Sequence, residues 1–496
     1  MTGFAPLVES LGSLGDPAEI AERFIDLPYL LLLDSATGAL PSGEAHPLGR
    51  FSFLTADPAV VVRSKGSRTE VGRAGRWEPA AGDALGVVRS LLSGWQVDPA
   101  PGLPPFQGGA AGYIGYDYGS VLERLPAPRF DDLAIHDVLL GLYDWVIAWD
   151  HRVGAAWILS TGLPADGEAR ARRARARLDE MLRRVRAPEV RRRLPPPAAP
   201  GDGPAPAPSY PVTAIDGADL LQLRSTFTHR GYLDAVTRVR DYIVAGDIFQ
   251  ANLSQRFQAP LREAPWDLYR RLRRRNPAAF AAYLGFEDVT VLSASPERFL
   301  RLDENGRHVE TRPIKGTRPR GLGPMHDAAL GRALAESDKD RSENVMIVDL
   351  LRNDLSRVCR AGTVRVPELF ALEQHPTVHH LVSTVVGELA PEADAVDLLR
   401  AAFPGGSITG APKVRAMEII AELEPTRRGV YCGSIGYLSA TGAMDTSIVI
   451  RTFTALRGRV YFQAGGGIVA DSDPEMEYRE TLDKARALVD SLGSRV

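Results

Sequence analysis

The stretch Val-Glu-Thr-Arg-Pro-Ile-Lys-Gly-Thr-Arg at residues 309–318 places one lysine, Lys315, between a proline turn and a Gly-Thr pair. This pattern predicts that a strand ends here and that Lys315 lies in the loop that follows. Most lysines are solvated surface charges. Acidic, glycine-rich and basic motifs elsewhere in the chain can, however, be interpreted as one pocket around Lys315.

The bulk composition indicates a soluble globular protein. The 496 residues suffice for two or three average domains, and the net charge of −3 provides no field to recruit nucleic acid or an anionic membrane. The chain shows neither a signal peptide nor an apolar run long enough to span a bilayer. Only Cys359 and Cys432 are present, which favours a reducing, cytoplasmic compartment over a disulfide framework.

The chain divides into three regions by composition. Residues 1–160 are predicted to be rich in strands, at 28–34, at 49–55, and as a hairpin of two apolar strands, 138–149 and 155–160. Residues 161–224 combine an Arg-rich helix with a Pro-rich linker, and residues 225–496 hold most of the chemically informative motifs. The Arg-rich helix lacks the interleaved aromatics of a nucleic-acid-binding arm, so a solvated helix is the preferred interpretation.

Two predicted helices, a long one through Glu343 and the last one, after Pro474, each carry an acidic pair at i, i+3: Asp340 with Glu343, and Glu477 with Glu480. That spacing puts both carboxylates of a pair on one helix face. Ordinary solvent exposure is a real alternative. If the two helices converge, the four carboxylates repel, and a divalent cation would stabilise the arrangement. A donor set of oxygens alone suits Mg²⁺ bridging to an anionic substrate.

Further motifs favour bound anions. Residues 405–413 form a glycine-rich turn before a predicted helix, which directs free N–H groups outward. Residues 465–470 match a dinucleotide fingerprint only weakly, so a backbone-amide cradle for a carboxylate is preferred. Arg451 follows an apolar strand pattern, where a guanidinium could bind a carboxylate or simply be solvated.

These motifs together resemble the chorismate-utilising enzyme family. The resemblance covers residues 225–490 nearly continuously and residues 1–160 more loosely. The stretches that carry it are Gly-Asp-Ile-Phe-Gln-Ala-Asn at 246–252, Ser-Pro-Glu at 295–297, Pro-Ile-Lys-Gly-Thr at 313–317, His-Leu-Val-Ser at 380–383, Gly-Ser-Ile-Thr-Gly-Ala-Pro-Lys at 406–413, and Gly-Gly-Gly-Ile-Val-Ala at 465–470.

The resemblance implies an α+β fold, in which two large antiparallel sheets pack as a sandwich with helices outside. Strands from the N-terminal region and from 225–490 would interleave. It also implies Mg²⁺ bound by Glu343 and Glu480, with Asp340 and Glu477 reaching the ion through water. Asp340 departs from the glutamate common in the family, and its shorter side chain favours the outer shell.

The resemblance further implies the residues that bind and transform chorismate. Lys315, Glu297 and His380 would be catalytic, with Glu297 as the general acid and then base. The residues implied to bind the substrate are Gly316, Thr317, Ser407, Tyr431, Arg451, Gly465, Gly466 and Gly467. Mg²⁺ would lower the pKa of Lys315 while Glu297 would raise it, and the sequence leaves open which dominates.

Two positions discriminate among the activities of the family. Members that add water carry a lysine where this chain has Gln250, and anthranilate-forming members carry alanine where it has Lys315. The resemblance therefore implies attack by Lys315 at C2 of chorismate, followed by ammonia at C4, to give 4-amino-4-deoxychorismate on the route to p-aminobenzoate and folate. The alternatives are anthranilate formation, for tryptophan biosynthesis, and a non-catalytic sensor.

Ammonia would come from a partner, since neither cysteine lies in a glutaminase-like motif. A separate glutamine amidotransferase subunit, forming a heterodimer, is implied. The motif at Ser35 also resembles the tryptophan pocket of the family, with Ala279, Phe280 and Ala281 as its other wall. Anthranilate-forming members carry Pro-Tyr-Met there, so feedback inhibition by tryptophan is not expected, although bound tryptophan is left open.

Overall fold

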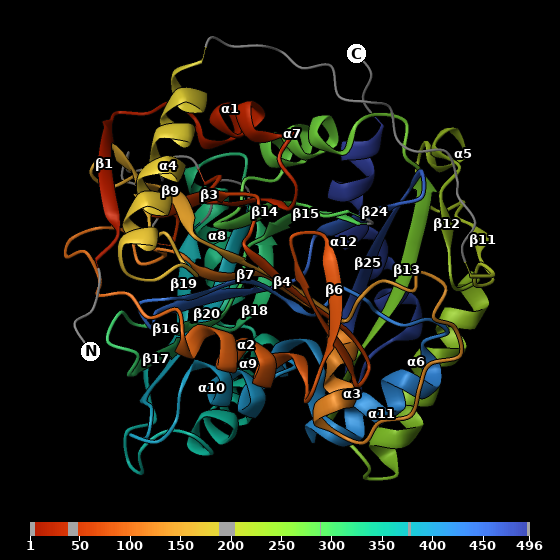
Figure 1. Cartoon of the computed structure of the whole chain (residues 1–496). Helices are drawn as coiled ribbons and strands as arrows, with labels where there is room; N and C mark the ends of the chain where they lie inside the picture. The colour runs from red at the N-terminus through yellow and green to blue at the C-terminus, as the bar shows by residue number, and fades with distance from the viewer. Residues whose placement is uncertain (1–4, 38–47, 188–203, 288, 375–377, 494–496) are drawn as a thin grey trace.

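Two large antiparallel sheets form the centre of the computed structural model, which describes residues 5–37, 48–187, 204–287, 289–374 and 378–493 (Figure 1). Within these residues, thirteen strands form the first sheet. In order they are β1 (Leu7–Gly12), β10 (Ala155–Ser160), β9 (Trp145–Asp150), β3 (Phe51–Thr55), β2 (Leu30–Asp34), β14 (Phe280–Gly285), β15 (Thr290–Ser295), β24 (Thr452–Leu456), β25 (Arg459–Ile468), β13 (Gln250–Pro260), β12 (Arg224–Ser225) and β11 (Tyr210–Pro211), with β21 (Gly410–Ala411) paired to β13.

The second sheet has twelve strands within the same residues. In order they are β18 (Ile314–Pro319), β20 (Val378–Glu388), β17 (His308–Thr311), β16 (Arg298–Leu302), β23 (Met444–Ile448), β22 (Ser434–Ser439), β7 (Gly109–Ile114), β8 (Val138–Tyr143), β4 (Val60–Lys65), β5 (Arg68–Arg73) and β6 (Arg76–Ala80), with β19 (Arg365–Gln374) paired to β20. Both sheets mix strands from before and after residues 188–203, which confirms the interleaved sandwich.

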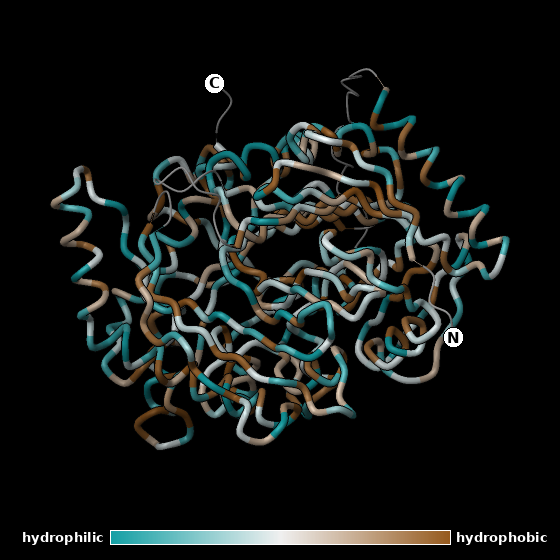
Figure 2. Tube along the Cα trace, turned by 90° about the vertical axis from the view of Figure 1, so that its left-hand side faces the viewer, coloured by the Kyte–Doolittle hydropathy of each residue, from teal (hydrophilic) through white to brown (hydrophobic). Residues whose placement is uncertain are grey.

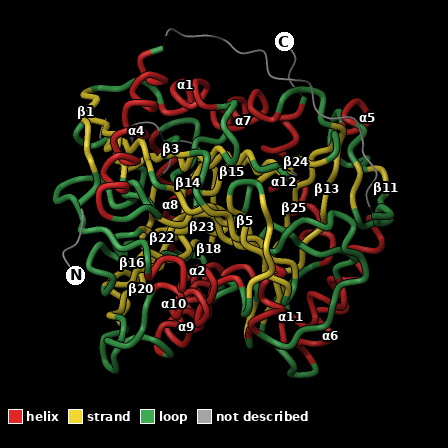
Figure 3. The backbone as a smooth tube through the Cα atoms, in the orientation of Figure 1, coloured by secondary structure: helices red, strands yellow, loops and turns green. Residues whose placement is uncertain are grey.

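Helices cover the outer faces of the two sheets, as Figure 3 shows in red around the yellow strands. The helices are α1 (Pro17–Ala21), α2 (Ala84–Ser93), α3 (Gly119–Leu122), α4 (Gly167–Arg186), α5 (Ala218–Leu221), α6 (His229–Val244), α7 (Pro265–Arg275), α8 (Pro324–Ala335), α9 (Asp338–Ser356), α10 (Ala395–Ala402), α11 (Lys413–Leu423) and α12 (Pro474–Leu492), with short 3₁₀ turns η1 (Glu22–Phe24), η2 (Tyr116–Tyr118) and η3 (Gly406–Ile408). None of the helices in the described residues is long and apolar enough to cross a membrane.

The core lies in layers that follow from this arrangement. Apolar side chains of α1, α4, α7 and α12 pack on the first sheet, those of α2, α9 and α10 pack on the second, and those of α6 and α11 pack on β13 and β25 of the first. Between the sheets, Phe53 and Phe106 contact the ring of Tyr437, at centroid distances of 5.4 and 4.7 Å. Hydrophobic segments accordingly run through the middle of the molecule in Figure 2, with hydrophilic ones outside.

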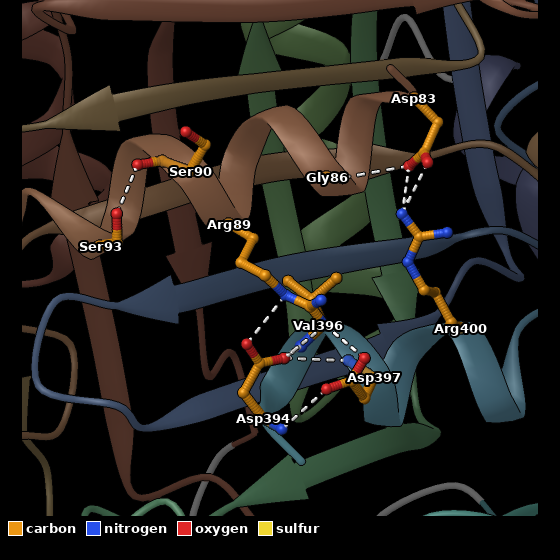
Figure 4. Close-up of polar contacts among 9 residues, drawn as sticks. All are labelled: Asp83, Gly86, Arg89, Ser90, Ser93, Asp394, Val396, Asp397 and Arg400. Atoms are coloured by element: carbon orange, nitrogen blue, oxygen red, sulfur yellow. Dashed lines mark hydrogen bonds and ion pairs between the residues drawn. The ribbon is translucent and has the colours of Figure 1, made fainter. Parts of the chain in front are cut away.

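Ion pairs join α2, from the first half of the chain, to α10, from the second half (Figure 4). Arg400 donates to both carboxylate oxygens of Asp83, at 2.6 and 2.7 Å, and Asp83 caps the N-terminus of α2. Arg89 binds Asp394 and Asp397, the two residues of the capping box that starts α10. Because α10 leads directly into the glycine-rich turn at 405–410, this contact anchors one end of that turn.

Two predictions from the sequence are corrected here. The apolar run at 138–149 is not one strand of a hairpin, because it breaks at Asp144 and crosses from the second sheet into the first; only β9 and β10 form the predicted pair. Asp144 is fully buried and bound by Arg173 of α4 at 2.7 Å. The sequence pattern does not reveal this crossing, because the strands before and after Asp144 are both apolar and each is buried in its own sheet. The long helix predicted through Glu343 is two helices, α8 and α9, separated where Ser337 caps α9.

Candidate active site

Lys315 lies on an edge strand of the second sheet and not in the predicted loop. Residues Ile314–Pro319 form β18, which pairs with β20 and has an irregular register between Ile314 and Thr317. Gly316 at this irregularity has a φ of +85°, and a Cβ there would lie 2.7 Å from Leu334 and 2.9 Å from Asp340 Oδ1. Glycine is therefore required for both the left-handed backbone and the close packing on α8 and α9. A proline and a glycine normally signal a loop, which is why the strand was missed.

Burial is the largest influence on the Lys315 ammonium. It lowers the pKa of Lys315 below the usual lysine value, and Lys484 adds to this effect by repulsion, although Glu343, Glu297 and Glu480 raise it. The net direction is downward, and burial is its main cause. A larger fraction of the amine is thus neutral, as a nucleophile requires.

Glu297 is the most strongly perturbed acid near Lys315. Its side chain is buried between β15 and β16, and burial raises its pKa to about 7, although Ser407, Lys315 and the Ile314 N–H each lower it. The Ser407 hydroxyl donates a 2.8 Å hydrogen bond to Glu297 Oε1. A carboxyl group that titrates near neutral pH can both give and take a proton. The structure thus pairs Ser407 with the acid.

His380 lies on β20 opposite Thr317 on β18, and its Nδ1 is 2.9 Å from the Thr317 hydroxyl. His380 is buried, whereas its neighbour His379 bonds Asp327 of α8 at 2.8 Å. Alternation along a strand puts the two histidines on opposite faces of the sheet. Only His380 therefore lies on the same side as the Thr317 hydroxyl.

The predicted acidic pairs do come from two facing helices. Glu477 is buried on α12 and accepts a hydrogen bond from Ser472 at 2.7 Å. A Cβ on Gly466 would lie 3.0 Å from Glu477 and 3.4 Å from Glu480, so both carboxylates approach the same backbone position. Solvent exposure, the alternative interpretation, therefore does not apply to Glu477.

Across from α12, burial raises the pKa of Glu343 on α9, and the charges of Asp340 and Glu480 raise it further, against Lys315 and Lys339. Asp340 Oδ2 accepts a 2.8 Å hydrogen bond from Arg318. Among the described residues no group of three or more His, Cys, Asp or Glu is closely enough arranged to hold a metal ion. The repelling carboxylates nevertheless fit a hard divalent cation, since all of their donors are oxygens.

Arg451 occupies the crossover between β23 and β24 with a φ of +51° and not the end of one strand. Burial lowers its pKa, and in the described part of the chain its guanidinium has no hydrogen-bond or ion-pair partner. The side chain is half-buried, so its guanidinium can bind either water or an anion from outside the chain.

The predicted glycines lie on β25, which pairs with β24, the strand that follows Arg451. The ladder between β24 and β25 ends at Tyr461, so within the described strands Gly465, Gly466 and Gly467 pair with β13 alone, and the Gly465 carbonyl accepts a hydrogen bond from Lys484 at 2.9 Å. A Cβ on Gly467 would lie 2.2 Å from the Gln250 amide nitrogen. These glycines are strand residues and not a phosphate-binding turn, which excludes the dinucleotide interpretation. Tyr431 is buried nearby, with the Arg428 guanidinium 5.7 Å from its ring centroid.

No pattern in the sequence singles out Arg428 as a site residue. It follows Arg427, and nothing in the local pattern distinguishes the two. In the structure Arg428 is 3% exposed and lies beneath the site, whereas Arg427 reaches toward Asp131 at 3.3 Å.

The residues compared with a tryptophan pocket line a separate cavity of about 1390 Å³. Ser35 donates to the Phe51 carbonyl at 2.6 Å and to the Ala279 carbonyl at 3.3 Å, which joins β2, β3 and the start of β14. Phe280 and Ala281 line the same cavity. The two predicted walls of the tryptophan pocket therefore lie next to each other. The adjacent Asp34 carboxylate forms an ion pair with Arg273.

Comparisons with known proteins agree with this architecture. The model of the family described as chorismate binding enzyme matches residues 46–490. Aminodeoxychorismate synthase component 1 of Salmonella typhimurium is 45% identical over 94% of this chain and 93% of its own. Anthranilate synthase component 1 of Pseudomonas aeruginosa is 40% identical over 97% and 93%. The crystal structure of anthranilate synthase component I from Streptococcus pneumoniae superimposes with a TM-score of 0.74 at 33% identity, covering 90% and 93%.

Proposed function

The chain belongs to the chorismate binding enzyme family, and we propose from this premise that it aminates chorismate at C4. The product would be 4-amino-4-deoxychorismate, the activity in the name of the Salmonella relative, on the route to p-aminobenzoate and folate. One observation carries the proposal: the half-buried Lys315 lies near Glu297, and desolvation lowers its pKa. A lysine with a lowered pKa next to a neutral-range acid suits covalent addition.

Lys315 acts as the nucleophile. Its neutral amine bonds to C2 of chorismate while the C4 hydroxyl leaves, and Glu297 gives that hydroxyl its proton. Ammonia then bonds to C4, the C2–nitrogen bond to Lys315 breaks, and the proton lost by the incoming ammonia goes to Glu297. The pKa of Glu297 near 7 supports both roles, because the protonated and ionised forms coexist at neutral pH. His380, beside Thr317, assists proton transfer or holds the ring.

Substrate carboxylates bind at the opposite end of the site. Arg451 supplies a half-buried guanidinium, and Gly465 to Gly467 supply backbone amides beyond the end of the β24–β25 ladder. Gly316 and Thr317 line the ring, with Tyr431 and Ser407 at its margins. Arginine forks and backbone N–H groups bind carboxylates through charge-assisted hydrogen bonds.

Mg²⁺ would be held by Glu343 and Glu480, with Asp340 and Glu477 acting through water. When bound, the ion supplies positive charge that neutralises a substrate carboxylate. Lys484, which now contacts Glu480 at 2.7 Å, would share that carboxylate with the ion. The raised pKa of Glu343, caused first by burial and then by neighbouring acids, supports a cation site here.

Ammonia would be delivered by a separate glutamine amidotransferase subunit in a cytoplasmic heterodimer. Burial raises the pKa of Cys359 to about 11 and that of Cys432 to about 12, so neither thiol can serve as a glutaminase nucleophile. The designation component 1 of the relatives also supports a second component. Free ammonium salts should replace the partner.

Anthranilate synthesis is the second candidate, because relatives with that name are about as similar. It would make Lys315 a bystander. The deciding experiment incubates the protein with chorismate, Mg²⁺ and ammonium at mildly alkaline pH and identifies the product. Release of 4-amino-4-deoxychorismate is expected, and anthranilate as the product would contradict the proposal.

A further inference from the structure

Arg428 joins three separate segments beneath the active site. Its guanidinium donates to both oxygens of Glu424, at 2.9 and 2.7 Å. It also donates to the carbonyl oxygen of Ile408 at 3.1 Å and to that of Asn252 at 2.6 Å. The planar fork of arginine is suited to reaching several acceptors in fixed directions, which a lysine ammonium cannot reproduce.

The ion pair beneath the site is saturated with hydrogen bonds. Glu424, 4% exposed, also accepts from the Ser254 N–H at 2.8 Å and from the Ser254 hydroxyl at 2.9 Å. A buried ion pair contributes little net stability compared with apolar residues of the same size. Its consequence here is geometric, because two backbone carbonyls are held at fixed positions.

The two carbonyl groups that Arg428 binds belong to the turn that carries Ser407 and to β13. Ile408 directly follows Ser407, whose hydroxyl donates to Glu297. Asn252 lies on β13, and its N–H donates to the Thr409 carbonyl at 2.7 Å. This hydrogen bond is a second contact between β13 and the turn. The turn carrying Ser407 is therefore fixed to β13 through Arg428 on one residue and through the backbone on the next.

We propose that Arg428 is a positioning residue that holds the Ser407 hydroxyl against Glu297 by fixing the carbonyls of Ile408 and Asn252. This inference rests on the proposed role of Glu297 as the acid and base of the reaction. Arg428 does not contact the reacting atoms and acts through Ser407. The titratable groups that act on Glu297 itself are Lys315 from β18 and Cys432 from the segment before β22, and Cys432 also interacts electrostatically with Arg428.

A double-mutant cycle tests the coupling between Arg428 and Ser407. The kcat with ammonium as nitrogen donor is measured for wild type, Arg428→Lys, Ser407→Ala and the double variant. Displacing a catalytic contact by about 1 Å can cost about a hundredfold in rate, so each single variant should lose about ten- to a hundredfold. If Arg428 acts through Ser407, the double variant is within about twofold of the slower single variant. If the loss of kcat in the double variant equals the product of the losses in the two single variants, the proposal is wrong.

The pH dependence of kcat/KM supplies a readout that a merely structural role would not move. The limb near pH 7 should shift to higher pH in Arg428→Lys, in the same direction as in Ser407→Ala, because both remove the hydroxyl donor from the ionised Glu297. An unmoved limb in Arg428→Lys, with the limb of Ser407→Ala moved, would also overturn the proposal.

Two further variants control for folding. Arg427→Lys changes the neighbouring arginine, which reaches only toward Asp131, and should keep kcat within about twofold. If Arg428→Lys does not fold, the same cycle is measured with Glu424→Gln, which weakens the hold on the guanidinium. Every rate refers to whichever aminated product the wild-type enzyme releases. A wild type that makes only anthranilate would therefore contradict the proposed function and still leave the coupling measurable.

Discussion

Ser407 and Glu297 are joined by a 2.8 Å hydrogen bond, in which the serine hydroxyl donates to a carboxyl group only 5% exposed to solvent. The bond favours the ionised form of Glu297 and so opposes the rise in pKa, to about 7, that burial causes. Ser407→Ala should therefore move the Glu297 limb of the kcat/KM profile to higher pH. A limb that stays in place, or moves to lower pH, would show that Ser407 contacts the substrate instead.

Lys315→Ala should abolish formation of 4-amino-4-deoxychorismate and leave any residual amination at C2. The variant loses the amine that occupies C2, so ammonia can attack only that carbon directly. Products are separated and identified after incubation with chorismate, Mg²⁺ and ammonium. Lys65→Ala, on β4 in a surface pair with Asp131, serves as the control and should behave as wild type. Native-rate synthesis of the C4 product by Lys315→Ala would exclude a covalent role for the lysine.

Arg451→Gln should weaken chorismate binding without weakening the fold. A hydrogen bond to a charged group contributes about 1.5–3 kcal/mol, so kcat/KM should fall by about ten- to a hundredfold. The unfolding temperature should stay nearly level, because the variant removes a half-buried cation that has no partner in the described residues. Arg459→Gln, on β25, is the matched control. A large loss of stability in Arg451→Gln would mean that the guanidinium supports the fold.

The sequence predicted the chemical character of the site better than it predicted the course of the backbone. The family motifs were enough to predict the sandwich, and the i, i+3 spacing was enough to place Glu477 and Glu480 on one face of α12. Local patterns failed where tertiary contacts decide the outcome. Lys315 lies on a strand because Gly316 fits against α8 and α9, and the chain changes sheets at Asp144 because Arg173 neutralises it there. Arg428 could not be distinguished from Arg427, since only three-dimensional neighbours determine which of the two is buried.

Metal binding can be tested without turnover. Mg²⁺ added to the wild-type protein should raise its unfolding temperature, because a ligand that binds only the folded state stabilises it. Glu343→Gln and Glu480→Gln should abolish that shift. Glu475→Gln should retain it, since Glu475 is on the same helix as Glu480 but pairs with His229 and Arg479 at the surface. Equal stabilisation of all four proteins by Mg²⁺ would place the ion elsewhere.

The two halves of the chain are joined by a buried pair and by an exposed one, and these should differ in energy. Asp132→Asn breaks the pair with Arg256, whose side chains are 6% and 3% exposed, and should lower the free energy of unfolding by about 3–5 kcal/mol, because Arg256 is left buried and uncompensated. Arg89→Ala, at a side chain 41% exposed, should cost about 1 kcal/mol or less. Arg256 outweighs burial and lowers the pKa of Asp132, so wild type should lose this contribution only as pH falls below the usual aspartate pKa of about 3.9. Denaturant unfolding of both variants at neutral and acidic pH measures the difference, and equal costs at neutral pH would refute the distinction.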